Sequence, residues 1–250
     1  MERRKIRRKS TSAAIYIPIA ALLVIFFMIY GTSAFLKIIN IEVDGSTRYS
    51  KAEIIAAAGI TKGENMLLVD IIDAQMRVYT ELPYISSVEI TRDMPDTIRI
   101  EVRESTPLAA IAFRGTYAVI DFSGKVLRIE VAAEHGLIEV RGFQPSEAIV
   151  GSIIKVEADN ETKLRYLIEI LTAIDSAGIR DNVTYLDITN IANINLDYLE
   201  RRILLGGPED ARNKLDKLPD RIEEVVKNTR DDKAGVYNMS RRPWIWEPER

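Results

Sequence analysis

Few residues in this chain of 250 could support metal binding or nucleophilic chemistry. The chain has one histidine, His135, followed by Gly136, and it has no cysteine. A zinc site needs several nitrogen or sulfur ligands, so a lone histidine can hardly form one. Without cysteine, disulfides and thiolate chemistry are excluded, which suits an exported protein. We therefore predict that His135 is a solvated loop residue and that the protein has no metal site and no cofactor.

One short motif resembles a catalytic one by its spacing. Ser152-Ile-Ile-Lys155 matches the S-x-x-K of penicillin-binding enzymes, in which the lysine activates the serine. That chemistry also needs a K-T-G strand, and Thr61-Lys-Gly63 has the wrong order. The sequence also lacks G-x-S-x-G, G-x-x-x-x-G-K and G-x-G-x-x-G. Neighbouring carboxylates such as Glu223-Glu224 are expected on the solvated face of an acidic chain, so we predict no catalytic residue.

The longest feature is an uncharged run from Ser10 to Leu36, almost wholly apolar from Ala13 onward. About 20 apolar residues in a helix cross the hydrocarbon of a bilayer, so residues 13–36 are predicted to be a transmembrane helix. The alternatives are a signal peptide cleaved near Thr32-Ser33-Ala34 and a buried core helix. The run is longer than the apolar part of a signal peptide and apolar all round, which favours an uncleaved anchor.

Charge gives the predicted orientation of this helix and bounds the kinds of partner. Six Lys and Arg side chains precede the apolar run against the single Glu2, so the basic tail over 1–12 is predicted to be cytoplasmic. Everything after Lys37 is then extracytoplasmic. Residues 38–250 hold 27 Lys and Arg against 36 Asp and Glu, a net charge of −9. Nucleic acid needs a concentrated basic surface, so we expect no nucleic-acid partner.

The first segment after the apolar run, residues 37–105, has a β-α-α-β-β pattern. Apolar and polar residues alternate over 39–43, 88–91 and 98–103, as in strands with one buried face. Ser50-Lys-Ala-Glu53 has the composition of a capping box, so a helix is predicted from there to Gly59. A second helix is predicted over 70–82, where Ile72, Met76 and Tyr79 share one face. The turn residues of 93–96 favour a hairpin of the last two strands, giving a three-stranded sheet covered by two helices.

The second segment, residues 106–240, has the pattern of a mixed α/β domain. Arg114-Gly115 can form a two-residue hairpin loop, and Gly124 can relieve a second turn. Apolar residues at helical spacing predict a helix over 161–177. Strands are predicted over 183–188, 193–198 and 236–240, the second as part of a half-solvated antiparallel sheet. A helix over 208–227 should break or kink at Pro219, and residues 241–250 form a polar and aromatic tail.

These motifs resemble the bacterial cell-division FtsQ/DivIB family, whose members have a single-pass anchor, a POTRA domain and a β domain. The strings that carry the resemblance are Ile39–Gly45, Ser50–Ile54, Gly63–Asp70, Leu82–Ile85, Met94–Ile100 and Val102–Pro107 in the first segment, and Ala118–Leu127 and Lys214–Leu218 in the second. The predicted fold class is therefore α+β: a transmembrane helix, a POTRA domain and a mixed α/β domain dominated by an antiparallel sheet. The region 130–160 and Tyr237–Ser240 depart from the family pattern.

The resemblance implies a non-enzymatic membrane scaffold at the division septum. Its partners would be small bitopic coiled-coil proteins of the FtsL and FtsB/DivIC type, which it would link to septal peptidoglycan synthesis, with no small-molecule substrate. Two alternatives stay open: a membrane-anchored cell-wall enzyme with two converging carboxylates, and a POTRA chaperone of outer-membrane export. The chaperone would be expected to have tandem POTRA repeats or a C-terminal barrel, and neither is visible.

The strand at 236–240 is the predicted docking site, because it comes last and could leave a sheet edge uncovered. The predicted partner-binding residues are Val236, Tyr237, Asn238, Met239, Ser240 and Arg241. The alternative is that this strand is paired inside the sheet. If it is an edge, Met239→Pro should weaken partner binding without unfolding the domain. Trp244 and Trp246 either pack on the domain or provide an exposed anchor.

Overall fold

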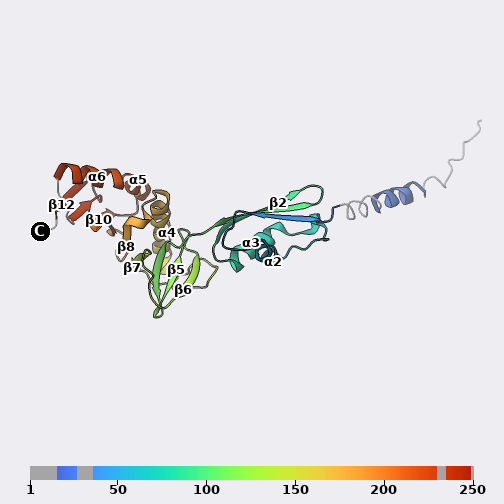
Figure 1. Ribbon diagram of the computed structural model, residues 1–250, viewed down its shortest axis with the longest axis horizontal. Coiled ribbons are helices and arrows are strands. Elements are labelled where there is room, and N and C mark those ends of the chain that lie inside the picture. The colour runs from blue at the N-terminus through green and yellow to red at the C-terminus, as the bar shows by residue number, and fades with distance from the viewer. Residues whose placement is uncertain (1–15, 27–35, 230–234, 249–250) are drawn as a thin grey trace, which may run out of the picture. The chain divides into compact units, whose positions relative to one another are not determined.

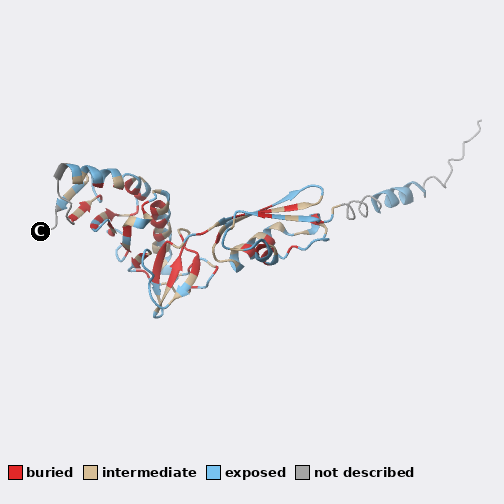
Figure 2. Cartoon of the chain, viewed as in Figure 1, coloured by how far each residue is buried: buried red, intermediate tan, exposed pale blue. Residues whose placement is uncertain are grey.

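The structure, a computed structural model, describes residues 16–26, 36–229 and 235–248. The chain divides into two compact units (Figure 1). Unit 1 comprises the residues up to Val78 together with Val88–Val102. Unit 2 comprises Tyr79–Ser87 together with the residues from Arg103 onward. Each unit has a buried interior of its own (Figure 2).

The predicted membrane span over 13–36 lies largely outside the described residues. Residues 16–26 are helical and exposed, whereas 1–15 and 27–35 are not described. In the described part of the chain, no helix combines the length and the apolar character needed to cross a bilayer. The span and the basic tail over 1–12 therefore stay predictions from the sequence.

Unit 1 has the predicted order of elements and one three-stranded sheet in the order β1-β3-β2. Its elements are β1 (Asn40–Asp44), α2 (Lys51–Ala58), the 3₁₀ helix η1 (Met66–Leu68), α3 (Ile71–Glu81), β2 (Ile85–Asp93) and β3 (Thr97–Glu104). β1 pairs parallel to β3, from Asn40 opposite Thr97 to Asp44 opposite Glu101. Both helices lie on one side of these strands in Figure 1.

Local signals of the sequence start and stop the helices of unit 1. The Ser50 side chain accepts a hydrogen bond from the Glu53 backbone N–H at 3.2 Å, and the Glu53 carboxylate accepts one from the Ser50 N–H at 2.8 Å. Gly59 then ends α2 in a left-handed conformation that a side chain would strain. In α3 the buried residues are Ala74 and Val78. The stripe over Ile72 and Met76 is instead exposed, so it is not a core face.

Unit 2 is built on a nine-stranded sheet in the order β12-β11-β10-β9-β8-β7-β4-β5-β6. Five of its pairings are antiparallel, and three, β4–β7, β7–β8 and β10–β11, are parallel. The strands are β4 (Ala109–Phe113), β5 (Thr116–Ile120), β6 (Val126–Glu130), β7 (Ile138–Arg141), β8 (Val183–Asp187), β9 (Ile194–Tyr198), β10 (Arg201–Gly206), β11 (Gly235–Asn238) and β12 (Ile245–Pro248). The mixed, mainly antiparallel sheet agrees with the prediction.

Three helices belong to unit 2: α4 (Glu161–Ser176), α5 (Ala211–Asp216) and α6 (Leu218–Thr229), with 3₁₀ turns at Ala158–Asn160 and Arg180–Asn182. The predicted break near Pro219 is present, because α5 ends before Lys217 and Pro219 lies in the first turn of α6. A proline lacks the N–H that a helix interior needs, but the first turn does not use it.

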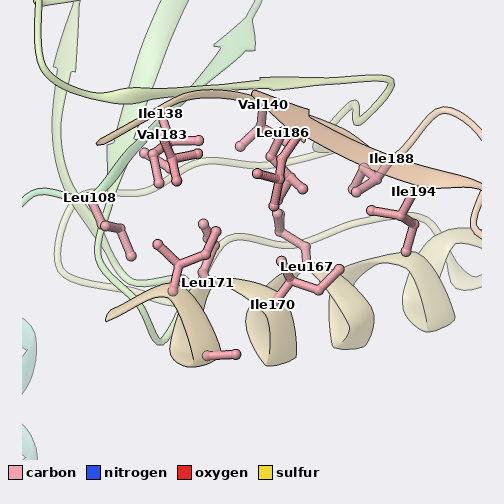
Figure 3. Packing of buried hydrophobic residues seen from close by; sticks show 14 of the residues in the cluster. Leu108, Ile138, Val140, Leu167, Ile170, Leu171, Val183, Leu186, Ile188 and Ile194 are labelled. Carbon is pink, nitrogen blue, oxygen red and sulfur yellow. The ribbon is translucent and has the colours of Figure 1, made fainter. Parts of the chain in front are cut away.

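The core of unit 2 lies between α4 and the centre of the sheet. Leu167, Ile170 and Leu171 point from α4 toward side chains of the strands (Figure 3). The facing residues include Ile138 and Leu186, and all five are fully buried. Burying one such aliphatic side chain contributes about 1.5–3 kcal/mol, so this layer fixes the helix on the sheet.

One sequence prediction about this sheet is wrong, and one strand is not predicted at all. Strand β9 is not half-solvated, because Asn195 is only 6% exposed although it belongs to the polar set of the alternation. β9 lies between β8 and β10 in the sheet, and such an interior strand can bury polar positions as well. Strand β7 was not predicted in the region 130–160, since its four residues are too short a signal for periodicity.

Candidate partner-binding interface

The predicted binding strand is an interior strand of the sheet. β11 pairs parallel with β10 on one side, with Ile203 opposite Tyr237. On its other side it pairs antiparallel with β12, with Tyr237 opposite Trp246. The expectation that this strand is the sheet edge is therefore wrong. The alternative, that this strand is paired inside the sheet, is confirmed for β11.

Strand β12 occupies the edge position instead. The stretch 241–250 was expected to be a tail, but Ile245–Pro248 forms a strand. Ile245 and Glu247 are exposed, whereas Trp244 and Trp246 are partly buried and pack against the core of unit 2. This alternation is that of a strand with one buried face. It extends over only four residues, with Pro243 before the strand and Pro248 at its end. Of the two alternatives for Trp244 and Trp246, packing on the domain is the one that is present.

The six predicted binding residues differ in access to solvent. Tyr237 is 4% exposed and Met239 is 1% exposed, so neither side chain offers much surface to a partner. Val236 and Asn238 are partly buried, and Ser240 and Arg241 are exposed. The Met239 N–H donates to the Leu204 carbonyl at 2.8 Å, inside the sheet. Met239→Pro would therefore damage the sheet and does not test binding alone.

The hydrogen bond from the Met239 N–H to the Leu204 carbonyl also determines which way the backbone groups of β12 point. Alternate residues of a strand point their N–H and C=O to the same side, so Val236 and Asn238 face β12 while Met239 faces β10. Their partners on β12, Glu247 and Ile245, use their backbone groups in that pairing. The N–H and C=O of Trp246 then point to the outer side. In the part of the chain that the structure describes, no strand pairs with that side.

A cavity of about 290 Å³ lies beside this edge. Its lining residues are Lys217, Arg221, Tyr237, Arg242, Pro243 and Trp244. Three of them are cationic and two are aromatic, so the cavity combines positive charge with apolar ring surface. Residues 38–250 as a whole are acidic, which makes this lining a local exception.

The cations of the cavity are partly compensated by nearby carboxylates. Arg221 pairs with Glu224 at 2.7 Å, and Arg242 approaches Asp210 at 3.4 Å. The Arg242 guanidinium also lies 5.8 Å from the centre of the Trp244 ring. These side chains are about half exposed or more, so the ion pairs are weak and can exchange for a carboxylate of a partner. Burial raises the pKa of the Tyr237 hydroxyl, which stays protonated at neutral pH.

A buried lysine holds the helices behind this edge. Lys214 is 9% exposed and donates to the Leu205 carbonyl at 2.6 Å, which joins α5 to β10. Burial lowers the pKa of its ammonium, opposed by the charges of Glu209 and Asp210. The lysine lies in the Lys214–Leu218 stretch that resembles the family, and its role here is structural.

Sequence reasoning missed a second buried lysine, at the other end of the sheet. Lys125 is fully buried, and its ammonium donates to the carbonyls of Tyr79 at 2.5 Å and Ile85 at 2.7 Å. The Tyr79 ring centre lies 3.7 Å away. Burial lowers the pKa of Lys125 to about 8, opposed by the charge of Asp121. A lysine next to a turn glycine reads as a surface residue, so no sequence signal predicts its burial.

Asp121 organises the turn that carries this lysine. Its carboxylate accepts hydrogen bonds from the backbone N–H groups of Ser123 at 2.9 Å and Lys125 at 3.0 Å. It also accepts from the hydroxyls of Ser123 and Ser105. A fully buried carboxylate with four donors is satisfied, so it stabilises the turn and is not poised for chemistry.

The residues considered for catalysis are not assembled into a site. His135 is exposed in a turn. The Lys155 ammonium binds the Glu147 carboxylate at 2.5 Å, and Ser152 is engaged through its backbone with Val126 and Ile149. Among the described residues, no cluster of three or more His, Cys, Asp or Glu side chains could hold a metal ion.

The sequence is similar to a known domain family and to several known proteins. Residues 36–105 match the family model of the FtsQ-type POTRA domain. The cell division protein FtsQ of Corynebacterium glutamicum is 30% identical over 170 residues, which are 64% of this chain and 75% of that protein. The cell division protein DivIB of Clostridium acetobutylicum is 25% identical over 209 residues, 82% of this chain and 79% of that protein. DivIB of Clostridium tetani is 26% identical over 210 residues, 82% and 77% of the two chains.

The match over residues 36–105 covers the elements of the three-stranded sheet, and the matches of 209 and 210 residues to the two DivIB proteins extend into the nine-stranded sheet. The chain therefore belongs to the FtsQ/DivIB family of cell division proteins.

Proposed function

We propose that this protein is a non-enzymatic, single-pass membrane scaffold of the division septum that binds its partners at strand β12. The observation that carries the proposal is that, within the described residues, no strand pairs with the outer side of β12, which lies beside a cavity lined by three cations and two aromatic rings. A partner strand can add to such an edge through main-chain hydrogen bonds, and side-chain pockets then give specificity.

The chemistry of the cavity indicates the charge of the partner. Lys217, Arg221 and Arg242 favour a segment that carries Asp or Glu next to the added strand. Ile245 adds an exposed apolar side chain to the edge. We propose small bitopic coiled-coil proteins of the FtsL and FtsB/DivIC type as the partners, which the family resemblance implies. The scaffold would link them to septal peptidoglycan synthesis.

The proposed organisation keeps the sequence-based boundaries except at the end of the chain. Residues 1–12 would be the cytoplasmic tail and 13–36 the single span. Residues 37–105 would be the POTRA domain, and the β domain would begin at 106 and extend past 240 to include β12. Both domains would be extracytoplasmic.

The decisive experiment is photo-crosslinking in cells from positions on the open edge. A photoreactive amino acid at Ile245 or Glu247 should capture a small single-span division protein, identified by mass spectrometry. The matched control is the same amino acid at Arg128 or Glu130 on β6, the opposite edge strand of the same sheet. Tyr237 and Met239 are unsuitable because their side chains are buried.

Capture from β12 and not from β6 supports the proposal. Capture from β6 alone, or of lipid and glycan alone, from a folded protein overturns the assignment of the edge. The alternative of a wall enzyme with two converging carboxylates then regains weight, and turnover of peptidoglycan by the purified protein is the measurement that tests it.

A further inference from the structure

We propose that the end of unit 1 where the chain leaves the apolar run dips into the outer leaflet of the membrane. The four apolar side chains that form this end are Ile39, Leu67, Leu68 and Met94, which we call the apolar tip. This inference rests on the membrane anchoring proposed above, and it adds a second, peripheral contact with the lipid.

The apolar tip surrounds the exit of the chain from the predicted span. The Met66 N–H donates to the Leu36 carbonyl at 2.8 Å, and Lys37 forms a β-bridge with Asn65. Leu67 and Leu68 directly follow Met66, so in space they lie next to Leu36, the last residue of the apolar run. The Ile39 N–H donates to the Asp96 carbonyl at 2.8 Å, which places the turn after Met94 at the same end.

The exposure of these side chains is high for their size. Leu68 is 82% exposed, Ile39 58%, Met94 57% and Leu67 50%. Single exposed apolar residues are common on soluble proteins, but four at one end of a small unit form a patch. A bilayer surface begins where the span ends, so lipid is the occupant nearest to this patch.

Hydrogen bonds hold the two leucines in a fixed position. The Asn65 side chain accepts from the Leu67 N–H at 2.9 Å, which starts the 3₁₀ helix η1. The Arg92 guanidinium donates to the Met66 carbonyl at 2.9 Å and to the Val69 carbonyl at 2.7 Å. Met66 is fully buried beneath them. The leucines are thus presented outward on a rigid turn and not on a loose loop.

The opposite end of unit 1 is polar. β1 spans five residues at about 3.3 Å each, so its far end lies about 16 Å from the apolar tip. Asp44, Arg48, Lys51 and Glu101 are among the exposed residues there. The four exposed apolar side chains thus gather at the near end, which is the arrangement expected of a unit that rests on a membrane.

The carboxylates at the apolar tip do not oppose this placement strongly. Glu64 accepts from the Thr61 hydroxyl at 2.6 Å, and Asp96 accepts from the Thr97 hydroxyl at 2.9 Å. Asp93 pairs with Arg99 at 2.9 Å. Lys37 and Lys62 are exposed at the same end and can meet anionic headgroups.

The absence of native cysteine permits a direct test. The full chain carries one fluorescent NBD label, at L68C or at E101C, in vesicles of phosphatidylethanolamine and phosphatidylglycerol. Lipids with a nitroxide near the headgroup should reduce emission from position 68 about twofold or more, and emission from position 101 little. A label at A20C, within the predicted span, should be quenched best by nitroxides deep in the acyl chains.

The three labels separate the two proposals. Quenching at 20 and 68 but not at 101 supports the apolar tip. Quenching at 20 alone overturns the tip and leaves the anchor, whereas no quenching at 20 overturns both. As a check on the label itself, Leu67→Ser with Leu68→Ser should reduce quenching of a label at M94C. The control substitution Met76→Ser, one turn further along α3, should not, and an equal effect would also overturn the tip.

Discussion

The two edge strands of the nine-stranded sheet differ in how their outer sides are covered. At β6, the Val126 N–H donates to the Ser152 carbonyl at 2.9 Å and the Val126 carbonyl accepts from Gly151 at 2.8 Å. Lys125 forms a β-bridge with Ile153 just before the strand. Further along β6, Arg128 forms ion pairs with Glu130 and Glu134. At β12, nothing in the described part of the chain pairs with the outer side.

The difference supports the proposal that β12, and not β6, is the docking edge. Unpaired edges invite unwanted strand addition, and proteins block them with loops and charges. β6 has both devices. β12 instead has exposed Ile245 beside a cationic cavity, which suits the docking surface proposed above.

The largest expected effect comes from the buried ammonium next to β6. Lys125→Met should lower the free energy of unfolding of unit 2 by about 3 kcal/mol, because buried backbone carbonyls lose their donor. Urea unfolding of the full protein in detergent, followed by tryptophan fluorescence, measures this for unit 2, since the only two tryptophans are Trp244 and Trp246. A loss below about 0.5 kcal/mol would contradict the role of Lys125 in holding this end.

The cost of Lys125→Met should also depend on pH. The folded pKa of Lys125 is lowered from 10.5 to about 8, so between these values the unfolded chain binds a proton that the folded chain has released. The stability of the wild type then rises with pH relative to the variant, and the cost of the substitution grows. Below about pH 8 the cost should be constant. The measurement is urea unfolding at about pH 7.5 and 9.5. If Lys125→Met lowers the free energy of unfolding equally at both pH values, the Lys125 ammonium stays charged over this range.

The next effect tests the open edge. Trp246→Pro removes the one outward N–H inferred for β12, whereas Trp246→Leu removes the indole and keeps that N–H. We expect the proline variant to bind the captured partner at least about tenfold more weakly than the leucine variant, in pull-down titrations. Equal binding by the two variants would mean that the partner contacts side chains and not the strand backbone.

A smaller effect is expected from the cavity. Arg221→Glu should weaken partner binding about tenfold at low salt, and the difference from the wild type should shrink at high salt because exposed charges are screened. Arg212→Glu makes the same change of charge on α5 outside the lining and should have little effect. An equal loss for both variants would indicate a general charge effect.

The smallest effect is expected at the β6 edge itself. Glu134→Gln removes one exposed partner of Arg128 and should cost about 0.5 kcal/mol or less in unfolding free energy. Partner binding should not change. A measurable loss of binding would break the contrast between the two edges, because it would place β6 in the interface.

Much of the fold was predictable because its signals are local. The capping box of α2 and the break at Pro219 are set by a few neighbouring residues, and both are present where predicted. The Arg114-Gly115 hairpin loop also forms, with both residues at positive φ. Such signals act over three or four residues and need no knowledge of the rest of the chain.

The position of β12 at the edge of the sheet was not predictable in the same way. Whether β11 or β12 ends the sheet depends on a reversal at residues 239–244 and on the packing of Trp246. The burial of Lys125 depends on carbonyls about 40 residues away in sequence. Periodicity reports which face of a strand is apolar, but not which strand lies beside it.

The order of strands along the chain has a consequence for biosynthesis. β12 is the last described strand, and β11 reaches β10 only through the connection that contains α5 and α6. Synthesis proceeds from the N-terminus, so β12 is completed after every other described strand exists. A chain interrupted before Trp244 has neither β12 nor the Trp244 wall of the cavity. Under the proposed function, such a chain lacks the docking edge and does not compete for partners.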